Sequence, residues 1–160
     1  MSIIFGIFDR KEKQIERKFS QVMEEALAYW DVDDKGNWNE GSVYLGHYML
    51  WSTPESKLEH LPHSTHIGNQ NLVITSDARL DNREVLIEKL GMSDISFEQI
   101  RDSDLLLEAY RKWGEECPKY LLGDFVFVIW DVIKEQFFCA RDHIGIKPFY
   151  YYLSDTTFVF

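Results

Sequence analysis

Apolar and polar positions alternate along the chain in runs that predict strands near both ends and helices between them. Residues 2–8 form a short apolar run bounded by charged residues, which is typical of a strand buried on both faces. Positions 15, 19, 22, 26, 27 and 30 are apolar at helical spacing and predict an amphipathic helix of about four turns. The polar segment 31–41, which contains glycine, predicts a loop.

The middle of the chain is expected to alternate between short strands and short helices. Strands are predicted near 43–50 and 72–75, and the stretch 53–70 between them is interrupted by two prolines and a glycine, which predicts irregular structure. Asp81 and Glu84 form a capping-box pattern for a helix that Gly91 ends. A second helix is expected over 103–113, followed by Gly114.

The last third of the chain is predicted to be β structure. Strand-like runs cover 124–132, 135–142, 148–153 and 156–160, and short polar turns separate them. Strands followed by helices and then by strands indicate an α+β fold in which helices cover sheets. Because the sequence stops at Phe160 inside a strand-like run, we expect a longer native protein.

Size and charge restrict the class of protein. The 160 residues, 45% of them hydrophobic, are enough for one globular domain with one good core. A net charge of −10 argues against nucleic acid or an anionic membrane as the main partner. We find no signal peptide and no apolar run of about 20 residues, so a cytoplasmic location is expected. Cys117 and Cys139 lack metal-ligand spacing and are expected to be reduced and structural.

Three motifs in the C-terminal half resemble a known family. They are DSDLLLEAYRKWGEE, YLLGDFVFVIWD and FCARDHIGIKPFYYY, and the upstream segments FGIF and RLDNREVLIEKLG extend the match over essentially the whole chain. This order resembles the glutaminase domain of class II amidotransferases of the asparagine synthetase family. Residues 79–83 and the Trp-Gly-Glu element are similar to those of asparagine-synthetase-like cyclases that close lasso peptides.

The resemblance implies a fold and a missing neighbour. Residues 1–160 are expected to form a four-layer αββα sandwich, the amino-terminal nucleophile hydrolase fold, truncated at its C-terminus and degenerate as a glutaminase. A C-terminal ATP-dependent synthetase domain is expected in the native protein, with ATP and magnesium as its cofactors. The Gly-rich pyrophosphate-binding loop of that domain does not occur in this sequence, so no cofactor is expected within these residues.

Glutamine hydrolysis in this family requires an amino-terminal cysteine whose own amine acts as the base. We place Phe5 at that position, where it offers neither a thiol nor a free amine, and we expect it to begin a buried strand. Ser2, exposed at the terminus if Met1 is removed, is an alternative nucleophile. It lies three residues away, about 10 Å along a strand, and on the opposite face from Phe5.

The resemblance also assigns a substrate pocket, most of which has changed. The family's arginine for the substrate carboxylate falls at Met49, and its Asn-Gly oxyanion pair falls at Asp77 and Ala78. A carboxylate there would repel a developing oxyanion. Only at Asp102 is the residue the same as in the family, where this aspartate holds the substrate ammonium. Alternatively, Asp102 caps the following helix.

Other candidates are expected to be structural. The hairpin motif Arg141, Asp142, Gly145, Lys147 and Pro148 is expected to hold a turn and a domain contact. The histidines at 60, 63 and 66 lie in a Pro-containing segment without carboxylates at ligand spacing, which favours a polar loop over a metal site. The tryptophans at 51, 113 and 130 are expected in the core.

Three functions follow from the resemblance. The first is a silent glutaminase-like domain of an amide-bond ligase of the lasso-peptide or macrolactam cyclase type, whose partners are its own synthetase domain and a precursor peptide or its processing proteins. The second is the N-terminal domain of an asparagine synthetase that uses glutamine or free ammonia. The third is a non-enzymatic docking module. Each of these three functions is compatible with a homodimer.

Overall fold

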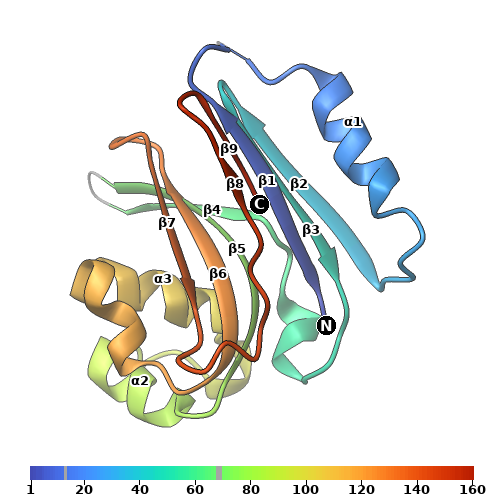
Figure 1. Ribbon diagram of the computed structural model, residues 1–160. Coiled ribbons are helices and arrows are strands. Elements are labelled where there is room, and N and C mark those ends of the chain that lie inside the picture. Colours follow the sequence, from blue (N-terminus) through green and yellow to red (C-terminus); the bar gives the residue numbers. More distant parts are fainter. Residues whose placement is uncertain (13, 68–69) are drawn as a thin grey trace.

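The computed structural model describes residues 1–12, 14–67 and 70–160. Its strands form two antiparallel sheets that face each other, with one α-helix outside the first sheet and two outside the second (Figure 1). This is the four-layer αββα sandwich that the sequence predicts. No helix among the described residues combines the length and the apolar character needed to cross a membrane.

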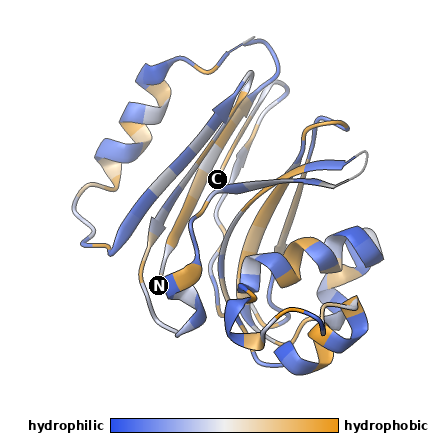
Figure 2. Cartoon of the chain, turned by 180° about the vertical axis from the view of Figure 1, so that it is seen from behind, coloured by the Kyte–Doolittle hydropathy of each residue, from blue (hydrophilic) through white to orange (hydrophobic). Residues whose placement is uncertain are grey.

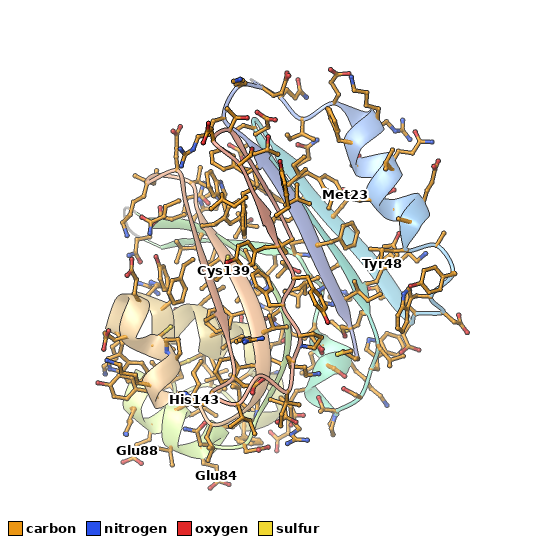
Figure 3. The ribbon with its side chains drawn as sticks, in the orientation of Figure 1. Met23, Tyr48, Glu84, Glu88, Cys139 and His143 are labelled. Carbon is orange, nitrogen blue, oxygen red and sulfur yellow. The ribbon has the colours of Figure 1, made fainter. Side chains whose placement is uncertain are left out.

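The first sheet joins the beginning of the chain to its end. Its strand order is β2-β3-β1-β9-β8, and β1 (Ile3–Asp9) pairs with both β3 (Val43–Met49) and β9 (Thr157–Val159). The outer strands are β2 (Asp34–Glu40) and β8 (Tyr152–Leu153). Helix α1 (Arg17–Ala26) covers the outer face, and Figure 3 shows Met23 and Tyr48 between this helix and the sheet.

The second sheet and its two helices form the larger half of the molecule. The sheet contains β4 (His63–Ile67), β5 (Gln70–Leu80), β6 (Gly123–Asp131) and β7 (Gln136–Arg141), in that order. Helices α2 (Arg83–Leu90) and α3 (Asp102–Trp113) cover its outer face. Short 3₁₀ segments occur at Glu55–Leu58, Phe97–Gln99 and Gly114–Tyr120.

Side-chain alternation along β1 sends neighbouring residues into different cores. Phe5 points toward α1, where its ring packs edge-on against Tyr48 at 5.2 Å between centroids. The same ring lies over Gly46 of β3, and a Cβ at that glycine would overlap it. Phe8 points the other way, between the sheets, and its ring contacts Trp130 of β6 at 5.2 Å. Odd and even positions of β1 therefore face opposite layers.

The apolar face of the second sheet forms the largest core. Leu72, Ile74, Phe125 and Phe127 of its central strands pack against the buried leucines of α3 with almost no exposed surface. Figure 2 shows largely hydrophobic central strands, and helices along which hydrophilic and hydrophobic residues alternate.

Two strands were not predicted from the sequence. Residues 31–41, expected as a loop, contain β2, whose residues pair with β3 over its whole length. The stretch expected to be irregular contains β4, which pairs with β5. Both are outer strands whose alternation consists largely of polar residues, so hydrophobic periodicity does not reveal them.

Two helices differ from the prediction in their ends. Helix α1 ends at Ala26, so it is shorter than the four turns expected through position 30. Helix α2 begins after Asn82 and shows no side-chain cap; the carboxylate of Asp81 instead accepts a hydrogen bond from Arg79 at 3.0 Å. Gly91 ends the helix in the left-handed conformation (φ 73°), as expected.

Candidate functional site

A small polar pocket lies at the end of the space between the two sheets. Its cavity measures about 10 Å³, which is about the space of one water molecule. Residues from β3, the segment after it, β5 and the start of α3 contribute. The lining residues are Ser2, Met49, Leu50, Ser52, Ser56, Glu59, Leu61, Ser76, Asp77, Ala78 and Asp102.

The pocket brings together four residues that the sequence assigns to the glutamine site, but Phe5 is not among them. Met49, Asp77, Ala78 and Asp102 all line it. Phe5 lies in the core under α1, on the face of β1 that points away from the second sheet. The placement of Phe5 at the nucleophile position is therefore corrected: Ser2 is the residue of the first strand region that reaches this pocket.

The first strand turns a different face toward the pocket than the one that carries Phe5. Ser2 and Phe5 do face opposite sides, as strand alternation requires. The face that meets the pocket is the one shared by Ser2 and Phe8, because β5 lies on that side.

Ser2 is buried and held by β3. Its Oγ accepts a hydrogen bond from the N–H of Leu50 at 3.0 Å and lies 3.4 Å from the sulfur of Met49. Met49 is 4% exposed, and its side chain also joins the core of the second sheet. An apolar, flexible side chain thus fills the space where the family resemblance expects a guanidinium.

The carboxylate of Asp77 is neutralised by a residue of the hairpin motif. Nζ of Lys147 donates to Oδ2 of Asp77 at 2.6 Å, and both side chains are largely buried. Lys147 is placed by the turn between β7 and β8, where the N–H groups of Ile146 and Lys147 each donate to the carboxylate of Asp142 at 2.9 Å. The ion pair therefore joins this turn to β5 at Asp77, a residue that lines the pocket.

The same turn explains several other motif residues. Burial pushes the pKa of Asp142 upward, but the backbone N–H bonds from Lys147, Ile146 and Ile144 outweigh it, so the pKa lies below its usual value. Gly145 has a φ of 71°, and a Cβ there would lie 3.3 Å from the guanidinium carbon of Arg141. Pro148 lies just beyond the turn.

Asp102 is occupied by a cation from within the chain. Nη1 of Arg83 donates to its carboxylate, and Nη2 of Arg83 donates to the carbonyl of Ile100 at 2.6 Å. Burial raises the pKa of Asp102 to about 6, and the Arg83 guanidinium opposes that shift. Asp102 is not the helix cap: α3 is capped at Arg101, in a reciprocal pair with Asp104.

Glu59 is a pocket residue that the sequence analysis missed. One of its carboxylate oxygens accepts the N–H of Ser103 at 2.9 Å, and the other accepts the Ser103 hydroxyl at 2.5 Å. Burial raises the pKa of Glu59 to about 6, although these hydrogen bonds lower it. A lone glutamate in an irregular segment carries no local signal, because its role depends on a helix about 40 residues further along the chain.

The remaining candidates lie outside the pocket. His63 lies on β4 with its ring 3.9 Å from Asp104, and His60 is exposed near Asp34. Trp130 is in the core as expected, and Trp113 stacks on Tyr120 at 4.2 Å. The prediction that Trp51 is a core residue is wrong, since 44% of it is exposed, because it follows the end of β3.

Both cysteines are free, and burial raises the pKa of each thiol to about 12, which disfavours the reactive thiolate. Figure 3 shows Cys139 on β7, and His143 in the turn that follows β7. Within the described ranges, no three His, Cys, Asp or Glu side chains group as metal ligands would.

Comparison with known proteins gives consistent results. A sequence family described as "Glutamine amidotransferase domain" matches residues 1–160. "Asparagine synthetase [glutamine-hydrolyzing] 3" of Bacillus subtilis is 30% identical over 158 residues, covering 98% of this chain and 26% of the relative. "Putative asparagine synthetase [glutamine-hydrolyzing] 2" of Methanocaldococcus jannaschii is 29% identical, covering 92% of this chain and 31% of the relative.

Among solved structures, the glutamine phosphoribosylpyrophosphate amidotransferase of B. subtilis is similar, with a TM-score of 0.74 and 15% identity. The match covers 99% of this chain and 41% of that one. At this identity the likeness shows the fold alone, which is the amino-terminal nucleophile hydrolase fold.

The chain spans about a quarter to a third of the length of the two curated relatives.

Proposed function

Because this chain belongs to the glutamine amidotransferase domain family and is similar to asparagine synthetases, we propose that it is a glutaminase-type domain that no longer hydrolyses glutamine. In the longer protein it accompanies an ATP-dependent domain that forms an amide bond. The reaction is of the lasso-peptide or macrolactam cyclase type, in which the amine is already part of the substrate. ATP and magnesium belong to that other domain.

The observation that carries the proposal is the size of the polar pocket. A cavity of about 10 Å³ has no room for glutamine, because ligand pockets of ordinary size measure about 300 Å³ or more. The side chain of Met49 fills the space beside this cavity. Because Met49 is only 4% exposed and packs in the core of the second sheet, it cannot move aside without disturbing that core.

The charges in the pocket support the same conclusion. Acyl transfer from an amide builds negative charge on oxygen, and a working site offers donors to that oxygen. Here Asp77 brings a carboxylate, and the cation beside it is already engaged at 2.6 Å. Asp102, which in the family holds the substrate ammonium, is engaged by Arg83. The polar groups that would bind glutamine are therefore satisfied within the chain.

A second candidate rests on the position of Ser2. If Met1 is removed, Ser2 becomes an amino-terminal residue with a hydroxyl and a free amine, at the pocket that Asp77 and Asp102 also line. In that case the domain would supply ammonia to an asparagine-synthetase-type reaction. The small volume of the cavity and the engaged carboxylates of Asp77 and Asp102 weigh against this candidate.

The deciding experiment measures glutamate release from glutamine by the purified chain, with intact mass spectrometry to establish whether Met1 is present. We expect no release above the rate of buffer alone, and the same result for Ser2→Cys, which restores a family thiol but leaves Met49 in place. Release by the wild-type chain that Ser2→Ala abolishes and Ser52→Ala retains would establish the second candidate instead.

The proposal for the whole protein has a separate test. We expect the longer protein to form its amide product from ATP and an amine-bearing substrate with equal yield in the presence and absence of glutamine. Product that depends on glutamine as the nitrogen donor would contradict a silent domain.

A further inference from the structure

A cavity of about 380 Å³ lies beside helix α3, apart from the polar pocket. We call it the lateral cavity, and it is lined by β4, by the connection between α2 and α3 (residues 91–101) and by one side of α3. Among the described residues, none lines both this cavity and the polar pocket. Its lining residues all belong to the middle of the chain, from position 63 to position 108. Its volume is in the range of ordinary ligand pockets.

The position of the cavity follows from the polar character of the outer strand β4. His63 and Thr65 of β4 pair with Ile74 and Leu72 of β5, so these four side chains share one face of the sheet. Helix α3 packs on the two apolar members of this set, and β4 lies above α3 in the view of Figure 1. The polar half of the shared face is left beside the helix, and the cavity lies there.

The deepest part of the lateral cavity is apolar. Ile100 is 1% exposed and Leu107 is 3% exposed, and both belong to the core of the second sheet. Met92 and Ile95 add apolar surface, and Ile95 belongs to the rim because it is 47% exposed. A bound molecule therefore gains free energy by placing an apolar surface against these aliphatic side chains.

The charged side chains of the cavity already neutralise one another. Arg101 donates from Nε and Nη2 to the carboxylate of Asp104 at 2.9 and 2.7 Å. Glu108 accepts a hydrogen bond from Arg111 at 2.6 Å. The His63 ring is neutral near pH 7, because burial lowers its pKa to about 4 and the Arg101 guanidinium lowers it further, with Asp104 opposing. An ion that entered would lose its hydration without meeting an unpaired opposite charge, so an uncharged occupant is expected.

The polar groups that remain are neutral donors and acceptors. Nδ1 of His63 is buried and has no hydrogen-bond partner in the described part of the chain. The carboxylate of Asp104 lies 3.9 Å from Nε2 of the same ring, which favours the proton on Nε2 and leaves Nδ1 as an acceptor. Thr65 and Gln99 add a hydroxyl and a side-chain amide. A molecule with N–H donors and acceptor nitrogens at its edge can satisfy these groups.

We infer that the lateral cavity binds an uncharged nitrogen heterocycle of about the size of a purine. The aliphatic side chains contact the face of the ring, and His63, Thr65 and Gln99 bind its edge. The inference goes beyond the proposed function and does not depend on it, because the two cavities share no lining residue among those described. A free base and the base of a nucleoside offer the same chemistry, and the test separates them.

The test is a titration of the isotope-labelled chain with adenine near neutral pH, followed in proton–nitrogen correlation spectra. We expect saturable shifts, with a Kd below about 1 mM, in the backbone signals of residues 63–65 and 99–108. The signals of residues 76–78, which line the polar pocket, should not move. The Nδ1 resonance of His63 should shift, because this atom gains a donor. Benzoate, a flat ring with a negative charge, should leave all these signals unchanged.

Adenosine distinguishes the two sources of the heterocycle. If adenosine binds as tightly as adenine and shifts the same signals, the cavity takes the base of a nucleoside. If adenosine binds at least about tenfold more weakly than adenine, the cavity takes a free base. Both results support the inference.

Protein variants locate the binding. Ile95→Ser should weaken adenine binding about fivefold or more, because it removes apolar contact. Val85→Ser is its matched control, since Val85 is also 47% exposed but does not line the cavity. His63→Phe keeps a ring but removes both nitrogens, so it should weaken binding about three- to tenfold. His66→Phe, on the same strand but not among the lining residues, should bind like the wild-type chain.

Three results would overturn the inference. They are the absence of saturable shifts up to about 5 mM adenine, equal binding of benzoate and adenine, and unchanged affinity in both Ile95→Ser and His63→Phe. Circular dichroism shows whether each variant is folded like the wild type. Adenine binding and glutamate release are separate measurements, so a chain that binds adenine but hydrolyses glutamine contradicts only the proposed function.

Discussion

At the scale of single residues, the carboxylate side chains that line the pocket have partners within the chain. Asp77 with Lys147, Asp102 with Arg83, and Glu59 with Ser103 each pair a buried polar group with a partner from a distant part of the chain. Buried charges are retained only when they are paired. The sequence therefore indicated that the family's pocket residues had changed, but it could not show which side chains of this chain now bind the remaining carboxylates. The reason is distance along the chain, because the two partners of each pair lie 70, 19 and 44 positions apart.

The pair between Asp77 and Lys147 leads to a prediction at this scale. Lys147→Met should leave the largely buried carboxylate without its cation and destabilise the chain by about 2 kcal/mol, since an unpaired buried charge costs more than the pair gains. Chemical denaturation measures the free energy of unfolding. Adding Asp77→Asn to Lys147→Met should recover most of the loss, because the uncompensated charge is then gone. Equal losses in the single and double variants would show that Lys147 acts through packing alone.

At the scale of elements, central strands were easier to predict than outer ones. The apolar runs of β1, β5 and β6 were recognised because central strands bury both faces and leave a nearly continuous hydrophobic signal. β2 and β4 were missed because each has only one neighbouring strand and is largely polar. Their pairing depends on strands elsewhere in the chain, which hydrophobic periodicity does not report.

The packing of β1 on β3 leads to a second prediction. Gly46→Ala places a methyl group where the Phe5 ring lies, so it should cost about 1–3 kcal/mol of stability through overpacking. Gly46 is not among the positive-φ glycines, so the cost is steric and not conformational. The double variant Phe5→Val with Gly46→Ala has a smaller side chain at position 5, which leaves room for the added methyl group. Its loss of stability should therefore be smaller than the sum of the losses in the two single variants. Strict additivity in thermal or chemical unfolding would contradict the contact.

At the scale of the whole molecule, two kinds of buried titratable group act on stability in opposite directions. His47 lies between the sheets, with Nδ1 3.1 Å from the Thr75 hydroxyl and Nε2 unpartnered among the described residues. Burial lowers the pKa of His47 from 6.5 to about 4, with Asp34 opposing, and burial lowers that of His63 to about 4 as well. Burial raises the pKa of Glu59 from 4.5 to about 6.

These shifts predict how stability changes with pH. Each histidine takes up its proton more readily when the chain is unfolded, so its contribution is complete above pH 6.5 and is lost as the pH falls toward 4. Glu59 takes up its proton more readily in the folded chain, so its contribution is complete below pH 4.5 and is lost as the pH rises through 6. Burial also raises the pKa of Asp102 from 3.8 to about 6, so Asp102 acts in the same direction as Glu59. Because the windows of the two histidines and the two carboxyl groups overlap, their effects on the wild-type free energy of unfolding oppose each other between pH 6.5 and 4.5. His47→Gln removes one group that destabilises the folded chain in acid, so the free energy of unfolding should rise toward the acid end. Glu59→Gln removes a group that stabilises it there, so the free energy of unfolding should fall toward the acid end.

Urea denaturation at several pH values measures the slope of the free energy of unfolding against pH for both variants, independently of the absolute stability that either variant loses. Slopes that move in the same direction in the two variants would mean that these side chains do not titrate in the folded chain as their burial requires.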